Sequence, residues 1–133
     1  MERILVFDGS LISVWVYPWK GLIHHQMKMY CHGEEFREAL AKGSEALELH
    51  KATKWLSDNR ATGPLPPEDE AWAANHWFPR TKAAGWKHWA MVQPMKILTQ
   101  LSLTRIISRY AELGINARVF SKLDEASQWL DAA

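Results

Sequence analysis

Residues 11–31 read LISVWVYPWKGLIHHQMKMYC, in which a Pro-Trp-Lys-Gly turn separates two apolar runs. Both runs alternate between apolar and more polar side chains, which is the period of a β-strand that buries one face. The shorter run Ile4–Phe7 lies upstream and ends at Asp8-Gly9, a hairpin signal. We therefore expect three antiparallel strands at the amino terminus, over Ile4–Phe7, Leu11–Tyr17 and Leu22–Cys31.

Helices and strands are expected to alternate after this meander. A helix is expected from Gly33 to about His50, because apolar residues recur at helical spacing after an acidic first turn. Gly43 lies in the apolar stripe of that helix and costs about 1 kcal/mol against alanine, so we expect the helix to approach the sheet closely there. Further strands are expected over Thr53–Ser57, His88–Val92 and Ala117–Phe120.

The second helix is expected to begin after the Pro-rich loop Asp58–Pro67, at the acidic run Glu68-Asp69-Glu70. Pro79 lies inside this helix. Its ring should clash with the carbonyl group of Asn75, so we expect the helix to kink or end there.

A third helix is expected over Ile97–Leu113, and a fourth after Ser121, which would form a capping box with Asp124. Strands that alternate with helices pair in parallel. The expected fold is therefore a single α/β domain over residues 1–133. Its mixed sheet has an N-terminal antiparallel meander and parallel strands joined by helices.

Composition limits the class of protein. The 133 residues carry 16 basic and 15 acidic side chains, a formal net charge of +1, which argues against a nucleic-acid binder that depends on phosphate contacts. The one cysteine, Cys31, cannot form an internal disulfide, and the amino terminus reaches a turn too early for a secretion signal. No apolar run approaches the roughly 20 residues of a membrane span. We expect a cytoplasmic domain without a cofactor.

Eight tryptophans are many for a chain of this length. Each indole can bury about 200 Å², and its N–H group needs a hydrogen-bond partner when buried. We expect one core of this size not to absorb all eight rings, so some would lie in a groove or a subunit interface. The alternative is that the extra rings enlarge the core or are scattered over the surface.

Several stretches that span nearly all of the chain after the first strand carry a family resemblance. They are GEEFREAL at 33–40, KWLSDNR at 54–60, WFPR at 77–80, AAGW at 83–86, and VFS, EA and WL within 119–130. Together with a strand meander followed by alternating helices and strands, they resemble a branch of uncharacterised bacterial SpoIIAA-like proteins with the STAS fold. The resemblance implies that fold and a regulatory role through protein contacts.

STAS regulators resemble one another in a phosphorylatable serine within an Asp-Ser-Ser-Gly-like turn. The corresponding stretch here is LSDNRATG at 56–63, in which Ser57 precedes the aspartate and no Ser-Gly turn follows. A phosphate would also be repelled by the acidic start of the second helix, so we do not expect a phosphoserine switch. The same broad fold class includes CRAL-TRIO-like lipid-transfer domains, which carry apolar ligands.

The carboxyl ends of parallel strands are a common place for ligands. Asp58, Asn59 and Arg60 follow a central strand and could form a polar recognition patch there. The alternative is that they form a turn with an ion pair that orders the long loop.

The second helix is aromatic nearly all round. Trp72, His76 and Arg80 are spaced i, i+4, i+8 on one face, while Trp77 and Phe78 point elsewhere. A helix that is apolar on most faces must be covered on more than its sheet side, by a neighbouring subunit, by the Pro-rich loop or by an apolar ligand.

Metal binding and nucleophilic catalysis find little support. His24 and His32 are eight residues apart, about 26 Å along a strand, so they cannot share a metal, and we expect solvated strand histidines. Cys31 lies among apolar neighbours, where a raised pKa and low reactivity are expected. The chain has no Gly-x-Ser-x-Gly elbow, P-loop or Gly-x-Gly-x-x-Gly motif.

The sequence thus favours a non-enzymatic SpoIIAA-like module that acts through protein contacts as a homodimer, joined through the second helix or the edge of the meander. The alternative is a carrier of a small apolar molecule. A third hypothesis, an enzyme, requires Asp58, Arg60 and His76 to converge. The carrier would need a pocket lined by some of Trp55, Trp72, Trp77 and Trp86.

Overall fold

The computed structural model describes residues 1–133 and has a six-stranded mixed sheet. The strand order in the sheet follows the order in the chain. The first three strands pair antiparallel and the last three add in parallel, which confirms the α/β class and the expected mixed sheet. The strands are β1 (Ile4–Asp8), β2 (Ile12–Tyr17), β3 (Leu22–Met27), β4 (Lys54–Asp58), β5 (His88–Val92) and β6 (Asn116–Phe120).

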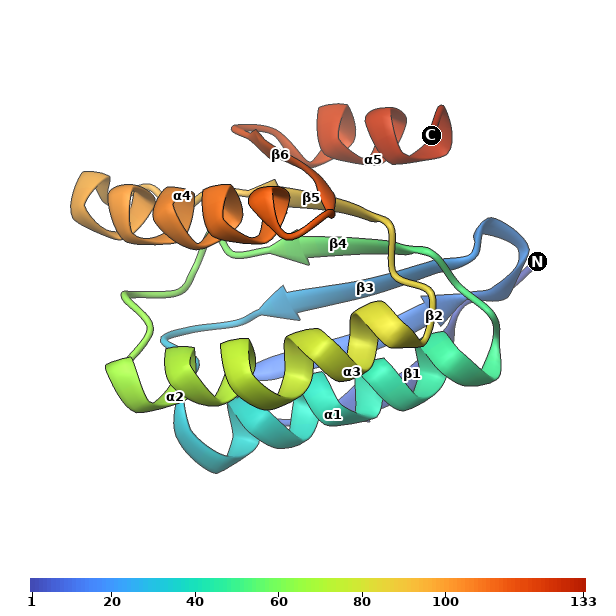
Figure 1. The fold of residues 1–133 in the computed structure, drawn as a ribbon, viewed down its shortest axis with the longest axis horizontal. Coiled ribbons are helices and arrows are strands. Elements are labelled where there is room, and N and C mark those ends of the chain that lie inside the picture. Colours follow the sequence, from blue (N-terminus) through green and yellow to red (C-terminus); the bar gives the residue numbers. More distant parts are fainter.

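Helices cover both faces of the sheet. The main ones are α1 (Gly33–Leu49), α2 (Pro67–Trp72), α3 (Phe78–Ala83), α4 (Ile97–Glu112) and α5 (Leu123–Asp131), with a π turn η2 (Ala73–Trp77) between α2 and α3 and a short 3₁₀ turn η1 (Pro18–Lys20). Figure 1 shows α5 on the opposite side of the sheet from α1 and α3. None of the helices combines the length and the apolar character needed to cross a membrane.

Two apolar cores lie on the two faces. The larger one consists of 24 buried residues, chiefly of β2, β3, β4, β5, α1, the second helix and α4. The smaller one consists of seven residues, five from β3, β4, β5 and β6 and two from α5. An aromatic cluster forms the centre of the larger core, and its ring centroids lie 4.3–6.5 Å apart. The cluster consists of Trp55, Trp77, Phe78, Trp86, Trp89 and Tyr110.

Gly43 of α1 lies directly against this cluster. A Cβ atom at this position would lie 2.5 Å from Cη2 of Trp55, which is fully buried on β4. Any larger residue would therefore force the helix away from the sheet. The expected close approach of α1 to the sheet is confirmed.

The expected strand Leu22–Cys31 was too long. β3 ends at Met27, since Met27 pairs with the first residue of β2 and Gln26 pairs with Asp58, the last residue of β4. Beyond that point the pairing ends after one more backbone hydrogen bond, which the N–H group of Lys28 donates to the carbonyl of Leu11 at 2.7 Å. The backbone N–H group of Cys31 instead donates to Oγ1 of Thr62 at 3.1 Å.

The second helix does not end at Pro79, which was one of the two expected outcomes. The chain continues through it, because the π turn Ala73–Trp77 precedes the proline and widens the helix. The N–H group of Phe78 donates to the carbonyl of Ala73, five residues earlier. A π turn is a known way to relieve a clash within a helix, here the clash between the proline ring and the preceding turn.

The expected capping box at Ser121 was also wrong. The helix α5 begins at Leu123, so the residue before it is Lys122, which caps no N–H group with its side chain. The Asp124 carboxylate accepts from the N–H group of Glu125 at 2.9 Å rather than reaching back to Ser121. Ser121 instead accepts a hydrogen bond from Nε2 of Gln93 at 3.3 Å.

Candidate functional site

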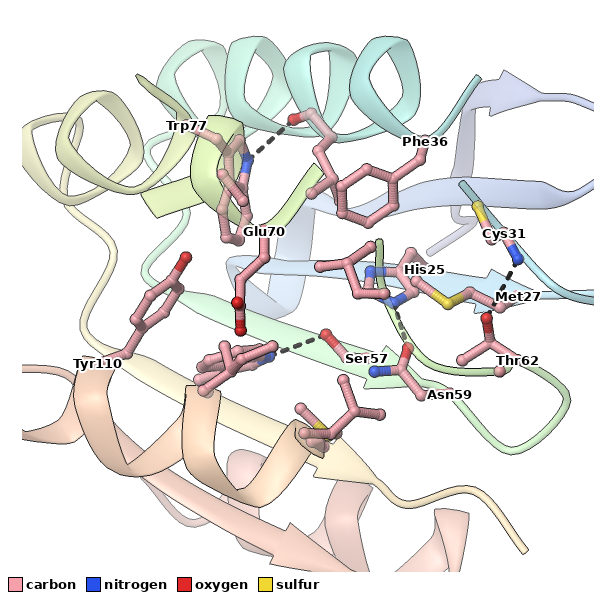
Figure 2. Close-up of a pocket in the computed structure, with 18 residues that line it drawn as sticks. His25, Met27, Cys31, Phe36, Ser57, Asn59, Thr62, Glu70, Trp77 and Tyr110 are labelled. Carbon is pink, nitrogen blue, oxygen red and sulfur yellow. Dashed lines mark hydrogen bonds between the residues drawn. The ribbon is translucent and has the colours of Figure 1, made fainter. Parts of the chain in front are cut away.

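A cavity of about 60 Å³ lies in the larger core, at the end of the sheet where the parallel strands finish. Its walls come from α1, the start of the second helix, α4 and the strands β3, β4 and β5 (Figure 2). Twelve of its 18 lining residues are hydrophobic, including Phe36, Leu40, Trp77, Trp89 and Leu103. Apolar walls with a few polar groups are typical of small-molecule sites.

One polar group on the wall is Asn59, held by a buried histidine. Nε1–H of Trp55 donates to Nδ1 of His25 at 3.0 Å, so the proton of the neutral ring lies on Nε2. That N–H group donates to Oδ1 of Asn59 at 2.8 Å, shown as a dashed line in Figure 2. The Asn59 amide nitrogen has no hydrogen-bond partner in the protein, so it is available as a donor at the cavity wall.

Burial keeps His25 neutral. It lowers the pKa of His25 to about 4, although the hydrogen bond to Asn59 and the charge of Asp58 act in the opposite direction. His24, on the other face of the sheet, has its pKa lowered to about 4 by burial and by the charge of His25. The expectation of solvated strand histidines was therefore wrong for these two, because His24 packs beside Trp15 and Tyr17 and His25 is enclosed by Trp55 and Asn59. His32, which follows the strand, is exposed.

Ser57 is the second polar group on the wall. Its side chain is only 1% exposed, and its Oγ accepts a hydrogen bond from Nε1 of Trp89 at 2.8 Å. The hydroxyl proton makes no hydrogen bond in the protein, so it can be donated into the cavity. A kinase could not reach this hydroxyl in the folded protein.

Glu70 is the one acidic residue that lines the cavity. Figure 2 shows its carboxylate pointing into the cavity from the second helix, towards Tyr110. Arg105 of α4 donates to Oε1 of Glu70 at 2.6 Å. This ion pair joins the second helix to α4 at the edge of the cavity.

The structure separates the residues that the sequence singles out. Asn59 and Trp77 line the cavity. Trp72 is half-buried against Phe36, whereas His76 and Arg80 are exposed and do not line it. The second helix buries Trp77 and Phe78 in the core of its own chain, so these rings need no other cover.

Asp58 and Arg60 form the turn and ion pair given above as one alternative. The Arg60 guanidinium donates to both carboxylate oxygens of Asp58, at 2.9 and 2.8 Å. Burial opposes ionisation of Asp58, but the hydrogen bonds from Arg60 hold its pKa below the usual value. Side chains alternate along β4, so Asp58 faces α5, while His76 lies on the helix that covers the other face. The three residues of the enzyme hypothesis therefore do not converge.

Cys31 also lines the cavity, from the segment after β3. Burial raises the pKa of its thiol to about 12, and the nearby carboxylates of Glu35 and Asp69 act in the same direction. The expected raised pKa is confirmed. A thiol with this pKa is a weak nucleophile near neutral pH.

Sequence reasoning missed His25, Ser57, Glu70 and Trp89 as cavity residues. His25 and Ser57 are opposite each other in the register of β3 and β4, and Trp89 follows on β5. Strand alternation puts Trp55 and Ser57 on the same face of β4, which is the one signal in the sequence that could have indicated this wall.

Comparisons with known proteins do not assign the chain to a family. No family model, no curated protein and no solved structure matches the chain. The side chains also form no group of three or more His, Cys, Asp or Glu that could hold a metal ion. The geometry of the cavity is therefore the main indication of function.

Proposed function

We propose that the protein is a non-enzymatic, SpoIIAA-like module that binds a small, largely apolar molecule in the cavity beside Trp77 and Trp89. The observation that carries this proposal is the combination of apolar walls with two donors, Ser57 and Asn59, that have no further partner inside the protein. The order of meander, helices and strands is in keeping with the SpoIIAA-like resemblance.

The size of the cavity indicates the size of the bound group. A group the size of a water molecule needs about 10–15 Å³ of cavity volume, so a cavity of 60 Å³ holds about four to six such groups. A short alkyl chain or one aromatic ring fits this space.

The hydrogen bonds of His25 favour binding over catalysis. Both ring nitrogens are occupied, Nδ1 by Trp55 and Nε2 by Asn59. His25 therefore has no free nitrogen with which to take the proton of Ser57, and the serine lacks the general base that a nucleophile needs.

We expect 1-hexanol and toluene to bind to the protein, and Ala73→Leu to weaken this binding more than tenfold. Ala73 is buried and lines the cavity, so a leucine side chain would occupy the space of the ligand. Tryptophan fluorescence reports binding, because two indoles form the wall. Ala83→Leu, at an exposed position of α3, is the matched control and should bind as the wild type does. No response to either compound near its solubility limit would contradict the proposal.

Self-association is a second candidate function, carried by an exposed apolar face of α4. Ile97, Leu98 and Leu101 at the start of this helix and Met95 just before it are 65–85% exposed. Contiguous apolar surface of this kind is typical of protein interfaces. We therefore propose α4, in place of the second helix or the meander edge, as the contact of a homodimer.

Light scattering at about 100 µM protein is expected to give the mass of a dimer. Leu98→Glu should convert it to a monomer, because the new charge would be buried without a partner. Ser108→Glu, on an exposed part of the same helix, should leave the dimer intact. A wild-type monomer at this concentration would rule out the dimer.

A further inference from the structure

A polar groove adjoins the cavity between the second helix and α4. The groove has a volume of about 270 Å³, and Arg105, Arg109 and Asn75 contribute its polar wall. Glu70, Ile106 and Tyr110 line both the groove and the cavity. Because three residues are shared, the two spaces are neighbours separated by these side chains, of which Glu70 is the most exposed.

The Glu70–Arg105 ion pair lies at this boundary. One oxygen of Glu70 accepts from Arg105, and the other has no partner. The two side chains are 29% and 62% exposed, so either can turn towards solvent without unfolding of the core. An ion pair with this exposure contributes at most about 1 kcal/mol, so a ligand can replace it at low cost.

Arg109 gives the groove a second guanidinium group. It follows Arg105 by four residues on α4 and therefore lies on the same face of the helix. Its side chain makes no ion pair and no hydrogen bond. Two arginines against one glutamate leave a net positive charge in the groove.

We propose, on the basis of the proposed function, that the ligand is a small monocarboxylic acid. Its largely apolar tail occupies the cavity, with any polar atom of the tail at Ser57 and Asn59, and its carboxylate binds Arg105 and Arg109 in the groove in place of the carboxylate of Glu70. A guanidinium group matches a carboxylate with two parallel hydrogen bonds, and Arg105 already holds a carboxylate at this boundary. An ammonium group would be repelled by the two arginines at this position.

Three probes with the same six-carbon chain separate the head group from the tail. Hexanoate, 1-hexanol and hexylamine are titrated into the full chain by calorimetry at pH 7. We expect hexanoate to bind at least tenfold more tightly than 1-hexanol, and hexylamine to bind more weakly than both. Glu70→Gln should increase the affinity for hexanoate severalfold, because it removes the competing carboxylate.

Arg109→Gln is the decisive variant. It should reduce the preference for hexanoate over 1-hexanol to less than threefold, because one of the two guanidinium groups that bind the carboxylate is removed. Arg80→Gln removes the same charge from an exposed site outside the groove and should keep the full preference. Circular dichroism checks that each variant is folded.

The outcomes distinguish the two proposals. If 1-hexanol binds and hexanoate binds no better, or if Arg109→Gln keeps the preference, the carboxylate inference is overturned and the apolar site stands. Tightest binding of hexylamine would make Glu70 the recognition group and also overturn it. If none of the three compounds binds, the proposed function itself fails.

Discussion

Trp86→Ala is expected to lower the free energy of unfolding by about 4 kcal/mol. Trp86 is 2% exposed, and its ring centroid lies 5.0 Å from that of Trp77, 5.3 Å from that of Trp89 and 6.0 Å from that of Trp55. Its indole N–H group also donates to the carbonyl of His88 at 3.0 Å. Alanine removes these contacts and leaves a large void. Domains of this size are stable by about 5–15 kcal/mol, so the variant loses much of its stability.

Urea denaturation followed by circular dichroism measures this change. Trp19→Ala is the control, because Trp19 is 43% exposed and outside the cluster, so we expect a loss below about 1 kcal/mol. The loss of unfolding free energy for Trp86→Phe should lie between those of the other two variants, since phenylalanine keeps a ring in the cluster. A loss below about 2 kcal/mol for Trp86→Ala would show that the cluster is not the centre of the core.

The packing of this cluster also corrects the expectation drawn from the number of tryptophans. Four of the eight indoles are at most 5% exposed within a single chain. Others stack with cations of their own chain, as Trp15 does with Arg3 and Trp72 with Arg37. The tryptophan content by itself therefore requires no partner, and the binding proposal depends instead on the cavity beside the rings.

Acidification from pH 6.5 to pH 4 is expected to destabilise the fold by about 3 kcal/mol for each of His24 and His25. Burial lowers the pKa of both rings from 6.5 to about 4. Between these values the unfolded chain binds protons that the folded chain does not. The stabilisation is therefore complete above pH 6.5 and is lost as the pH falls towards 4.

The charged groups near these rings do not reverse the effect. Asp58 raises the pKa of both histidines, whereas Arg3 and Arg60 lower that of His24. Burial also lowers the pKa of His88, with Lys54 and Lys87 acting in the same direction. His88 therefore adds to the loss of stability in acid.

The free energy of unfolding in urea, measured at intervals from pH 7.5 to 4, tests this prediction. His25→Gln should flatten the pH profile, because glutamine keeps a donor and an acceptor but does not titrate in this range. His76→Gln, at an exposed position, should leave the slope unchanged. A wild-type stability that stays constant over this range would contradict the burial of the two rings.

Most of the fold could be predicted from the sequence, because hydrophobic periodicity and the residues that begin or end helices and strands are local features. The alternation in residues 12–17 and the helical stripe after Gly33 placed β2 and α1 to within about one residue. The errors occurred where the structure of one segment depends on a neighbouring segment. β3 ends where its partners end, and Pro79 is accommodated by the turn before it. Neither fact is present in the local pattern.

The site could be predicted less well, because it depends on contacts between segments that are distant in the sequence. Asn59 and Trp77 were singled out as candidates, but on arguments about a loop and a helix face, not about a cavity. The cavity needs His25, Ser57 and Tyr110 to meet from β3, β4 and α4, which only the assembled sheet and helices bring about. The burial of His25 likewise depends on Trp55 of the neighbouring strand and on Asn59 of the following loop, which bond to the two nitrogens of its ring.

The agreement between the strand order in the sheet and the order in the chain has a consequence for how the protein folds. Each strand pairs with the strand that precedes it, so no strand is inserted between two that have already paired. The longest interval between paired strands, from Asp58 to His88, is bridged by the continuous helical segment of α2, η2 and α3, and the other two parallel connections are bridged by α1 and α4. Such short-range topology favours rapid folding. The sheet can thus grow from one edge while the chain leaves the ribosome, each new strand docking on a finished neighbour.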